Sequence, residues 1–124
     1  MTDEAKAVEI FKTAVARTRE GCLPWELSGN QGPGSVFECR TPAGFILRMY
    51  PYTILDDNGS PDGLPSLTLY DDSDELIFDI KLGVEGVTAS ELSDLYEAVR
   101  GFALGIPTKL DAILKDLGAM TPGR

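Results

Sequence analysis

Apolar residues recur at helical spacing over the first twenty residues of the chain. Thr2 stands where an N-cap residue is expected, and Asp3 and Glu4 occupy the first turn, where acidic groups complement the helix dipole. The apolar residues fall on one face of such a helix: Ala7, Val8, Ile10, Phe11, Ala14 and Val15. The pattern predicts a helix over residues 3–20, which Gly21 ends.

Four segments in the middle of the chain alternate between apolar and polar residues, the period of a strand with one buried face. They span residues 36–40, 45–50, 66–70 and 76–82. None of the connections between them is long enough for a crossover helix, so an antiparallel meander is expected. The alternation predicts this inward-facing set: Phe37, Cys39, Phe45, Leu47, Met49, Leu67, Leu69, Leu76, Phe78, Ile80 and Leu82.

Two passages around these strands lack any periodic pattern. The polar, glycine-rich passage at residues 28–34 is predicted to be a mobile loop, and it lacks the Lys and Ser/Thr of a phosphate-binding loop. The connection at residues 51–65 contains three prolines and two glycines and is long for a compact domain. We expect it to be either functional or disordered.

The end of the chain carries the clearest helical signal. Thr88 and Glu91 form a capping box, in which each side chain accepts a hydrogen bond from the backbone of the other residue. An apolar stripe follows: Leu92, Leu95, Tyr96, Val99, Phe102, Ala103 and Ile106. Gly105 and Pro107 end this helix, and a second helix continues to Gly118. The second helix is expected to bury Leu110, Ile113, Leu114 and Leu117.

These patterns predict an α+β fold with an N-terminal helix, a four-stranded antiparallel meander and a C-terminal helical pair packed on one face. The 124 residues suit a single domain, 1–124, with a helix at 3–20, a sheet at 36–82 and two helices at 88–117. Apolar residues make up 43% of the chain, which suffices for a core without a disulfide or a metal.

The formal net charge of −9 comes mainly from one stretch of the chain. Residues 49–80 contain eight acidic residues and no Lys or Arg, whereas the rest of the chain has twelve acidic and eleven basic residues. The eight are Asp56, Asp57, Asp62, Asp71, Asp72, Asp74, Glu75 and Asp79. All but the last fall in two loops that leave opposite ends of the predicted third strand. This acidic balance disfavours direct binding to nucleic acid, which depends on Lys and Arg.

The residue types exclude several enzyme classes. Histidine is absent, so zinc enzymes and Ser-His or Cys-His hydrolases are not expected. Cys22 and Cys39 are too few for a disulfide framework and should be free thiols, at least one of them in the core. Without a leader or a long apolar run, the chain is expected to be cytoplasmic and to bind no membrane.

The acidic loops invite a metal or acid–base interpretation. Polar side chains stand at every second position of one loop, as in a calcium site: Asp56, Asn58, Ser60 and Asp62. The EF-hand pattern would place glycine at Pro61 and glutamate at Leu67, so calcium is disfavoured. The acids at 71–75 fall on a hairpin tip with no apolar neighbours to raise a carboxylate pKa. We therefore predict no catalytic residue, no metal site and no cofactor.

The outward-facing residues of the same strands form a second candidate surface. Apolar and aromatic residues alternate there with charged ones: Ile46, Tyr50, Thr68, Tyr70 and Ile77 with Glu38, Arg40, Arg48, Asp79 and Lys81. Such a composition is typical of a docking surface, unless the first helix covers this face instead. The predicted partner-binding residues are Ile46, Tyr50, Tyr70 and Ile77.

Two motifs near the ends of the chain resemble a group of small uncharacterised bacterial α+β domains. One is T-x-x-G-x-L-x-W, from Thr18 to Trp25, and the other is L-x-x-L-Y, from Leu92 to Tyr96, followed by Val99 and Arg100. Domains of this group occur in bacterial conflict and mobile-element systems, often beside effectors, so the resemblance implies an adaptor role. Physically, Trp25 is expected to be an aromatic anchor between the first helix and the sheet.

The sequence as a whole favours a non-catalytic cytoplasmic module that binds another protein, with a homodimer as one candidate assembly. One alternative is an acidic mimic of nucleic acid that inhibits a DNA-binding protein or nuclease. A second alternative is an enzyme that uses carboxylates and a metal.

Overall fold

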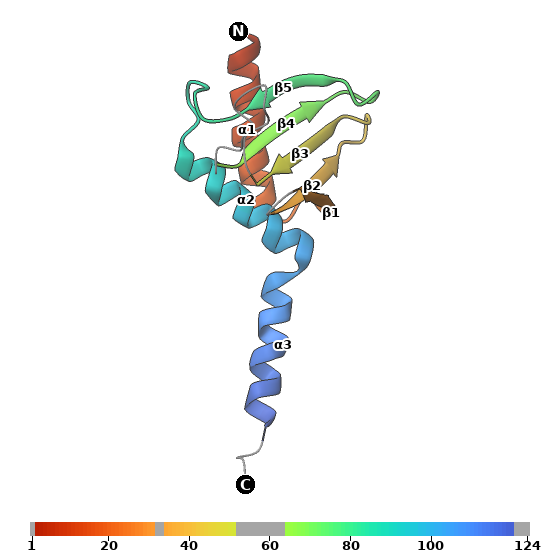
Figure 1. Ribbon diagram of the computed structural model, residues 1–124, viewed down its shortest axis with the longest axis vertical. Helices are drawn as coiled ribbons and strands as arrows, with labels where there is room; N and C mark the ends of the chain where they lie inside the picture. Colours follow the sequence, from red (N-terminus) through yellow and green to blue (C-terminus); the bar gives the residue numbers. More distant parts are fainter. Residues whose placement is uncertain (1, 32–33, 52–63, 121–124) are drawn as a thin grey trace.

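The computed structural model describes residues 2–31, 34–51 and 64–120 of the chain (Figure 1). It is an α+β fold with an N-terminal helix, a five-stranded antiparallel sheet and two C-terminal helices. The elements are α1 (Asp3–Arg19), β1 (Glu26–Gln31), β2 (Gly34–Arg40), β3 (Ile46–Tyr50), β4 (Ser66–Tyr70), β5 (Leu76–Ile80), α2 (Ala89–Leu104) and α3 (Ile106–Ala119).

The sheet is a meander in which each strand pairs with the next along the chain, in the order β1-β2-β3-β4-β5. Residue pairing aligns Phe37, Met49, Leu67 and Ile80 in one row across β2 to β5. All four side chains are fully buried. This apolar row is the centre of the core, and it confirms the predicted antiparallel topology and the inward orientation of these four residues.

Both α1 and α2 pack on the face of the sheet that carries the apolar row (Figure 1). α1 contributes Ala7, Phe11 and Ala14 to the core, and α2 contributes Leu92, Leu95 and Val99. The two helices are also joined on their outer sides, where Lys12 donates a hydrogen bond to Glu91. The hydrogen bond from Lys12 lowers the pKa of Glu91, and the hydrogen bonds from Thr88 lower it further.

The strand β1 corrects the prediction of a mobile loop at residues 28–34, and the sheet therefore has five strands instead of four. Sequence alternation misses it because the strand is polar and contains Gly29, next to which the pairing with β2 shifts register. Its backbone pairs with β2, whose outer N–H and C=O groups would otherwise lack a partner.

The segment from Thr18 to Trp25 shows a structural role for each named residue of the T-x-x-G-x-L-x-W motif. Gly21 adopts a left-handed conformation with φ 73°, which allows the chain to leave α1. The indole nitrogen of Trp25 then donates a 2.9 Å hydrogen bond to the hydroxyl of Thr18, and both side chains are buried. Leu23 packs against the core between them. The predicted anchoring role of Trp25 is confirmed.

The structure also corrects the packing of α3. Its apolar side chains were expected to be buried against the sheet, yet no residue of α3 is buried and the helix extends away from the body (Figure 1). The reason is the connection: Gly105 alone, at φ 61° and ψ 36°, separates α2 from α3. An antiparallel helical pair needs a loop of about two to five residues to reverse the chain.

Three residues at the ends of strands also differ from the prediction. Phe45, Leu76 and Leu82 were placed in the inward-facing set, but each is substantially exposed. Phe45 and Leu82 stand just before and just after a strand, at the periphery of the core that α1 and α2 form. Leu76 pairs with Tyr70 across an irregularity in β5, so it lies on the face opposite the core. Alternation predicts neither whether another element reaches a side chain nor where a bulge changes the face on which it lies.

The two cysteines are free thiols, as predicted, with Cys39 buried in the core and Cys22 exposed. Burial, and secondarily the charge of Glu26, raise the pKa of Cys39. Within residues 2–31, 34–51 and 64–120, no helix has the length and apolar character needed to cross a membrane.

The capping box at the start of α2 yields a stability prediction. Thr88 accepts a 3.1 Å hydrogen bond from the backbone N–H of Glu91, whose carboxylate accepts from the backbone N–H of Thr88 at 3.2 Å. Thr88→Ala should lower the free energy of unfolding by about 1 kcal/mol and Tm by about 3–6 °C. Ser90→Ala, which removes an exposed hydroxyl from the same turn, is the control for thermal denaturation. Equal losses in the two variants would contradict a contribution from the cap.

Candidate functional site

The face of the sheet opposite α1 and α2 carries no helix of the described chain (Figure 1). We call it the open face, and its side chains come from β2 to β5: Val36, Glu38, Arg40, Ile46, Arg48, Tyr50, Ser66, Thr68, Tyr70, Leu76, Ile77 and Asp79. The alternative that the first helix covers this face is wrong, because the buried residues of α1 belong to the core on the other face.

A polar row runs across the open face, directly behind the apolar row of the core. Residue pairing aligns Glu38, Arg48, Thr68 and Asp79 on four neighbouring strands. The row is joined in pairs: Arg48 Nε donates to Glu38 Oε1 at 3.0 Å, and Thr68 Oγ1 donates to Asp79 Oδ1 at 3.1 Å. Cross-strand pairs of this kind stabilise a sheet and fix the orientation of its side chains.

Arg48 is the most highly connected side chain of the open face. Besides Glu38, its guanidinium contacts Asp74 with 3.0 Å between Nη2 and Oδ1, and it lies 4.7 Å from the centre of the Tyr70 ring. Burial opposes the charge, but the bond to Glu38 and the charge of Asp74 outweigh it, so the pKa of Arg48 is raised. Arg40 also donates to Glu38, at 3.3 Å. The guanidinium of Arg48 is therefore held in place by its neighbours and is fully charged.

Tyr50 and Tyr70 form a pair on adjacent strands. Their hydroxyl oxygens are 3.0 Å apart, and both rings are partly buried. Burial, together with the hydrogen bond to Tyr70, raises the pKa of Tyr50 to about 12. Tyr50 is therefore uncharged near neutral pH. The two rings offer aromatic area, and their hydroxyl groups offer polar contacts at the edge of the rings.

The two isoleucines of the predicted site have different environments. Ile46 is only 2% exposed and lies between its ladder partners Arg40 and Tyr70. It is therefore buried within the open face and offers almost no area to a partner. Ile77 is 53% exposed. It is the extra residue at an irregularity in β5, where Leu69 pairs with Phe78 and Tyr70 pairs with Leu76. A bulge of this type redirects a side chain out of the ladder, which places Ile77 at the surface.

Four residues of the acidic stretch, Asp71, Asp72, Asp74 and Glu75, occupy the turn between β4 and β5. Asp71 shapes this turn, because its Oδ1 accepts hydrogen bonds from the backbone of Ser73 and Glu75, both at 2.9 Å. Asp74 has φ 65° and reaches Arg48. A Cβ on Gly44 would lie 3.1 Å from Cβ of Asp72, so this turn lies beside the turn between β2 and β3. The acidic turn therefore borders the open face.

The remaining predicted acidic residues, Asp56, Asp57 and Asp62, lie outside the described residues, as does the segment considered for calcium. Within residues 2–31, 34–51 and 64–120, no group of three His, Cys, Asp or Glu side chains is arranged to hold a metal ion.

Two neighbouring cavities lie on the helical side of the molecule, one of about 370 Å³ and the other of about 390 Å³. Leu23, Thr41 and Leu47 line both of them, between the end of α1 and the turn from β2 to β3. Ile10 and Arg17 of α1 line the first, and Cys22 lines the second. Their walls are largely apolar, and the thiol of Cys22 contacts the backbone oxygen of Glu20 at 3.9 Å and its carboxylate at 3.8 Å.

Sequence comparison finds no matching family model, and neither the curated proteins nor the solved structures contain a match. The resemblance of the two terminal motifs to small bacterial domains thus stays a prediction.

The pairing of Arg48 with Asp74 is the part of the site that sequence reasoning missed. The two residues are distant in sequence, and their contact depends on strand register and on the left-handed backbone of Asp74. The exposure of Ile77 was predicted, but its cause, the bulge, has no signal in the sequence. The interleaved charges themselves were predicted correctly from alternation.

The tyrosine pair gives a pH prediction. In the unfolded chain Tyr50 releases its proton near its ordinary pKa of 10, whereas in the fold it keeps the proton until about pH 12. Proton release therefore favours the unfolded state above pH 10, and stability should fall between pH 10 and 12. Tyr50→Phe should make this fall shallower in denaturant titrations across that window. An ultraviolet difference titration of the two proteins should show Tyr50 itself ionising near pH 12; identical curves would contradict the prediction.

Proposed function

We propose that the protein is a non-catalytic protein–protein interaction module that binds its partner through the open face. The observation that carries this proposal is a sheet face that no helix of the described residues covers, on which aromatic and apolar side chains stand beside an arginine fixed by three neighbours. Tyr50, Tyr70 and Ile77 supply contact area, and Arg48 supplies a directed charge.

The composition of the open face supports binding to a protein surface. Tyrosine and arginine are enriched among the residues that dominate protein–protein binding energy. The hydroxyl pair between Tyr50 and Tyr70 and the bonds of Arg48 already hold these side chains in place. Association therefore loses little side-chain entropy, which is a main cost of forming an interface.

Charge indicates the chemistry of the partner. The acidic turn of residues 71–75 borders the open face, and the whole chain has a net charge of −9. A complementary partner would present an apolar patch with Lys or Arg beside it. The adaptor role in a bacterial conflict or mobile-element system, implied by the resemblance of the terminal motifs, is compatible with such a partner.

The test is affinity capture from the native host, followed by calorimetry with the purified partner. Ile77→Asp should weaken binding by at least about tenfold, because it places a charge in the apolar part of the interface. Ile10→Asp is the matched control, since Ile10 is also partly exposed but lies on α1, on the other side of the molecule. Both variants should keep the melting temperature of the wild type within a few degrees.

Two outcomes would contradict the proposal. One is equal binding of the wild type and Ile77→Asp to every captured protein. The other is binding that is lost at about 0.5 M salt and competed by DNA while Ile77→Asp has no effect, which would favour the nucleic-acid mimic.

A further inference from the structure

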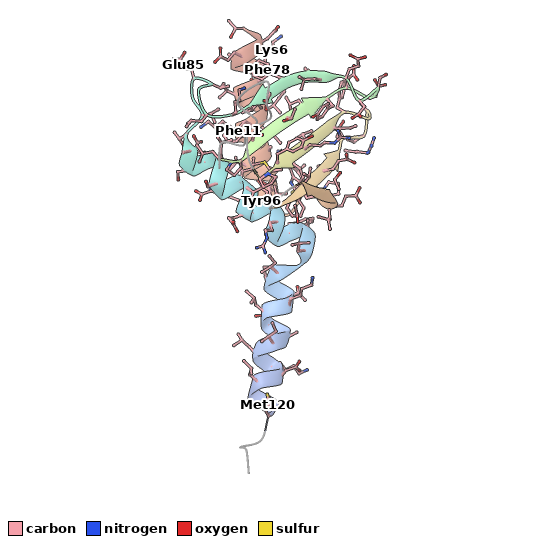
Figure 2. All side chains as sticks on the ribbon, in the orientation of Figure 1. Lys6, Phe11, Phe78, Glu85, Tyr96 and Met120 are labelled. Atoms are coloured by element: carbon pink, nitrogen blue, oxygen red, sulfur yellow. The ribbon has the colours of Figure 1, made fainter. Side chains whose placement is uncertain are left out.

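The helix α3 presents a continuous apolar face that nothing in the described chain covers. Its exposed apolar side chains are 53–70% accessible, and they follow the spacing of a coiled coil, alternately three and four residues apart. Together with Ile106 these are Leu110, Ile113, Leu117 and Met120, and Leu114 lies at the edge of the stripe. Figure 2 shows the side chains of α3 projecting freely from the helix, with Met120 at the far end from the body.

An isolated helix with these properties is poorly stabilised. α3 has 14 residues, no side-chain hydrogen bond at its N-cap and no buried residue. Its first turn has no acidic residue and its last turn has no basic residue. Lys109 lies toward the N-terminus and Asp116 toward the C-terminus, so both charges oppose the helix dipole. A helix of this length gains most of its stability from packing, which implies a partner for the apolar face.

The charges of α3 are self-complementary. Lys109 and Asp116 are seven residues apart and flank the same edge of the apolar stripe, whereas Asp111 and Lys115 are on the far side of the helix. If two copies of α3 align antiparallel with Leu110 against Ile113, Lys109 of one copy and Asp116 of the other lie roughly 3 Å apart along the axis. Two-fold symmetry then forms this ion pair twice.

Net charge also selects the antiparallel arrangement. The two lysines and two aspartates of α3 cancel, so the helix is neutral although the chain carries −9. A parallel pair would bring two acidic bodies together at one end. The antiparallel pair places them at opposite ends of a helix about 21 Å long, beyond the screening length of physiological salt.

We propose that α3 is a self-association element, which binds α3 of a second copy of this chain as an antiparallel pair. This goes beyond the proposed function, because it concerns the isolated protein and a surface separate from the open face. Two helices of about four turns bury less than a typical stable interface, so dissociation in the micromolar range is expected.

Sedimentation equilibrium of the full chain tests the proposal, from about 1 to 200 µM protein. The wild type should change from monomer to dimer across this range, and Leu117→Asp should remain monomeric throughout. Because α3 contributes no buried residue to the body, Leu117→Asp should keep the wild-type melting temperature at about 1 µM, where both proteins are monomers. A wild type that stays monomeric, or a Leu117→Asp variant that still dimerises, would overturn the proposal.

Charge reversal tests the orientation of the helices. Lys109→Asp should weaken the dimer about tenfold, and the double variant Lys109→Asp/Asp116→Lys should restore it. Lys115→Asp is the matched control, since it makes the same change on the far side of the helix and should leave dissociation unaltered. Lys109→Asp also favours the helix dipole, so weaker dimerisation could not be attributed to loss of the helix. If the double variant is no tighter than Lys109→Asp, the antiparallel pair is wrong.

Discussion

The apolar row of Phe37, Met49, Leu67 and Ile80 is the constraint on which the rest of the structure depends. It crosses four strands, and every member is fully buried under α1 and α2. Because side chains alternate between faces, a slip of one residue in any strand would move a polar residue into the core. The core row therefore fixes the register of β2 to β5.

The open face follows from the same register. When Phe37, Met49 and Leu67 align on one face, Glu38, Arg48 and Thr68 must align on the other. The ion pair and hydrogen bonds of the polar row are thus consequences of a register set by apolar packing. The surface proposed to bind a partner inherits its rigidity from the core, which is why its side chains can be fixed without a helix above them.

The sequence predicts those parts of the fold in which local pattern and burial agree. Alternation located β2 to β5, and the capping box located the start of α2, because in each case one face of the element meets the core. The strand β1 was missed because its stability comes from backbone pairing with β2, which leaves no apolar pattern. The prediction that α3 packs on the sheet was wrong, because an apolar stripe predicts burial but does not identify the surface that buries it.

In the candidate site, too, local pattern predicts some features, whereas others depend on tertiary contacts. Tyr50, Tyr70 and Ile77 could be assigned to one surface from alternation alone, whereas the burial of Ile46 and the contact of Arg48 with Asp74 depend on neighbours distant in sequence. These are tertiary effects, and a single sequence without strand register contains no signal for them.

The open face and α3 also differ in the chemistry of association that they support. The open face combines hydrogen-bonded aromatic residues with charges, which suits a specific partner, whereas α3 offers an almost purely apolar stripe with one complementary charge pair. Since α3 extends away from the body, a dimer formed through it would leave both open faces accessible (Figure 1). Two linked open faces bind a multivalent or oligomeric target more tightly than one, without any new contact, because the second binding event becomes intramolecular. A modest affinity at each open face would then suffice, which fits the small contact area that five-residue strands provide.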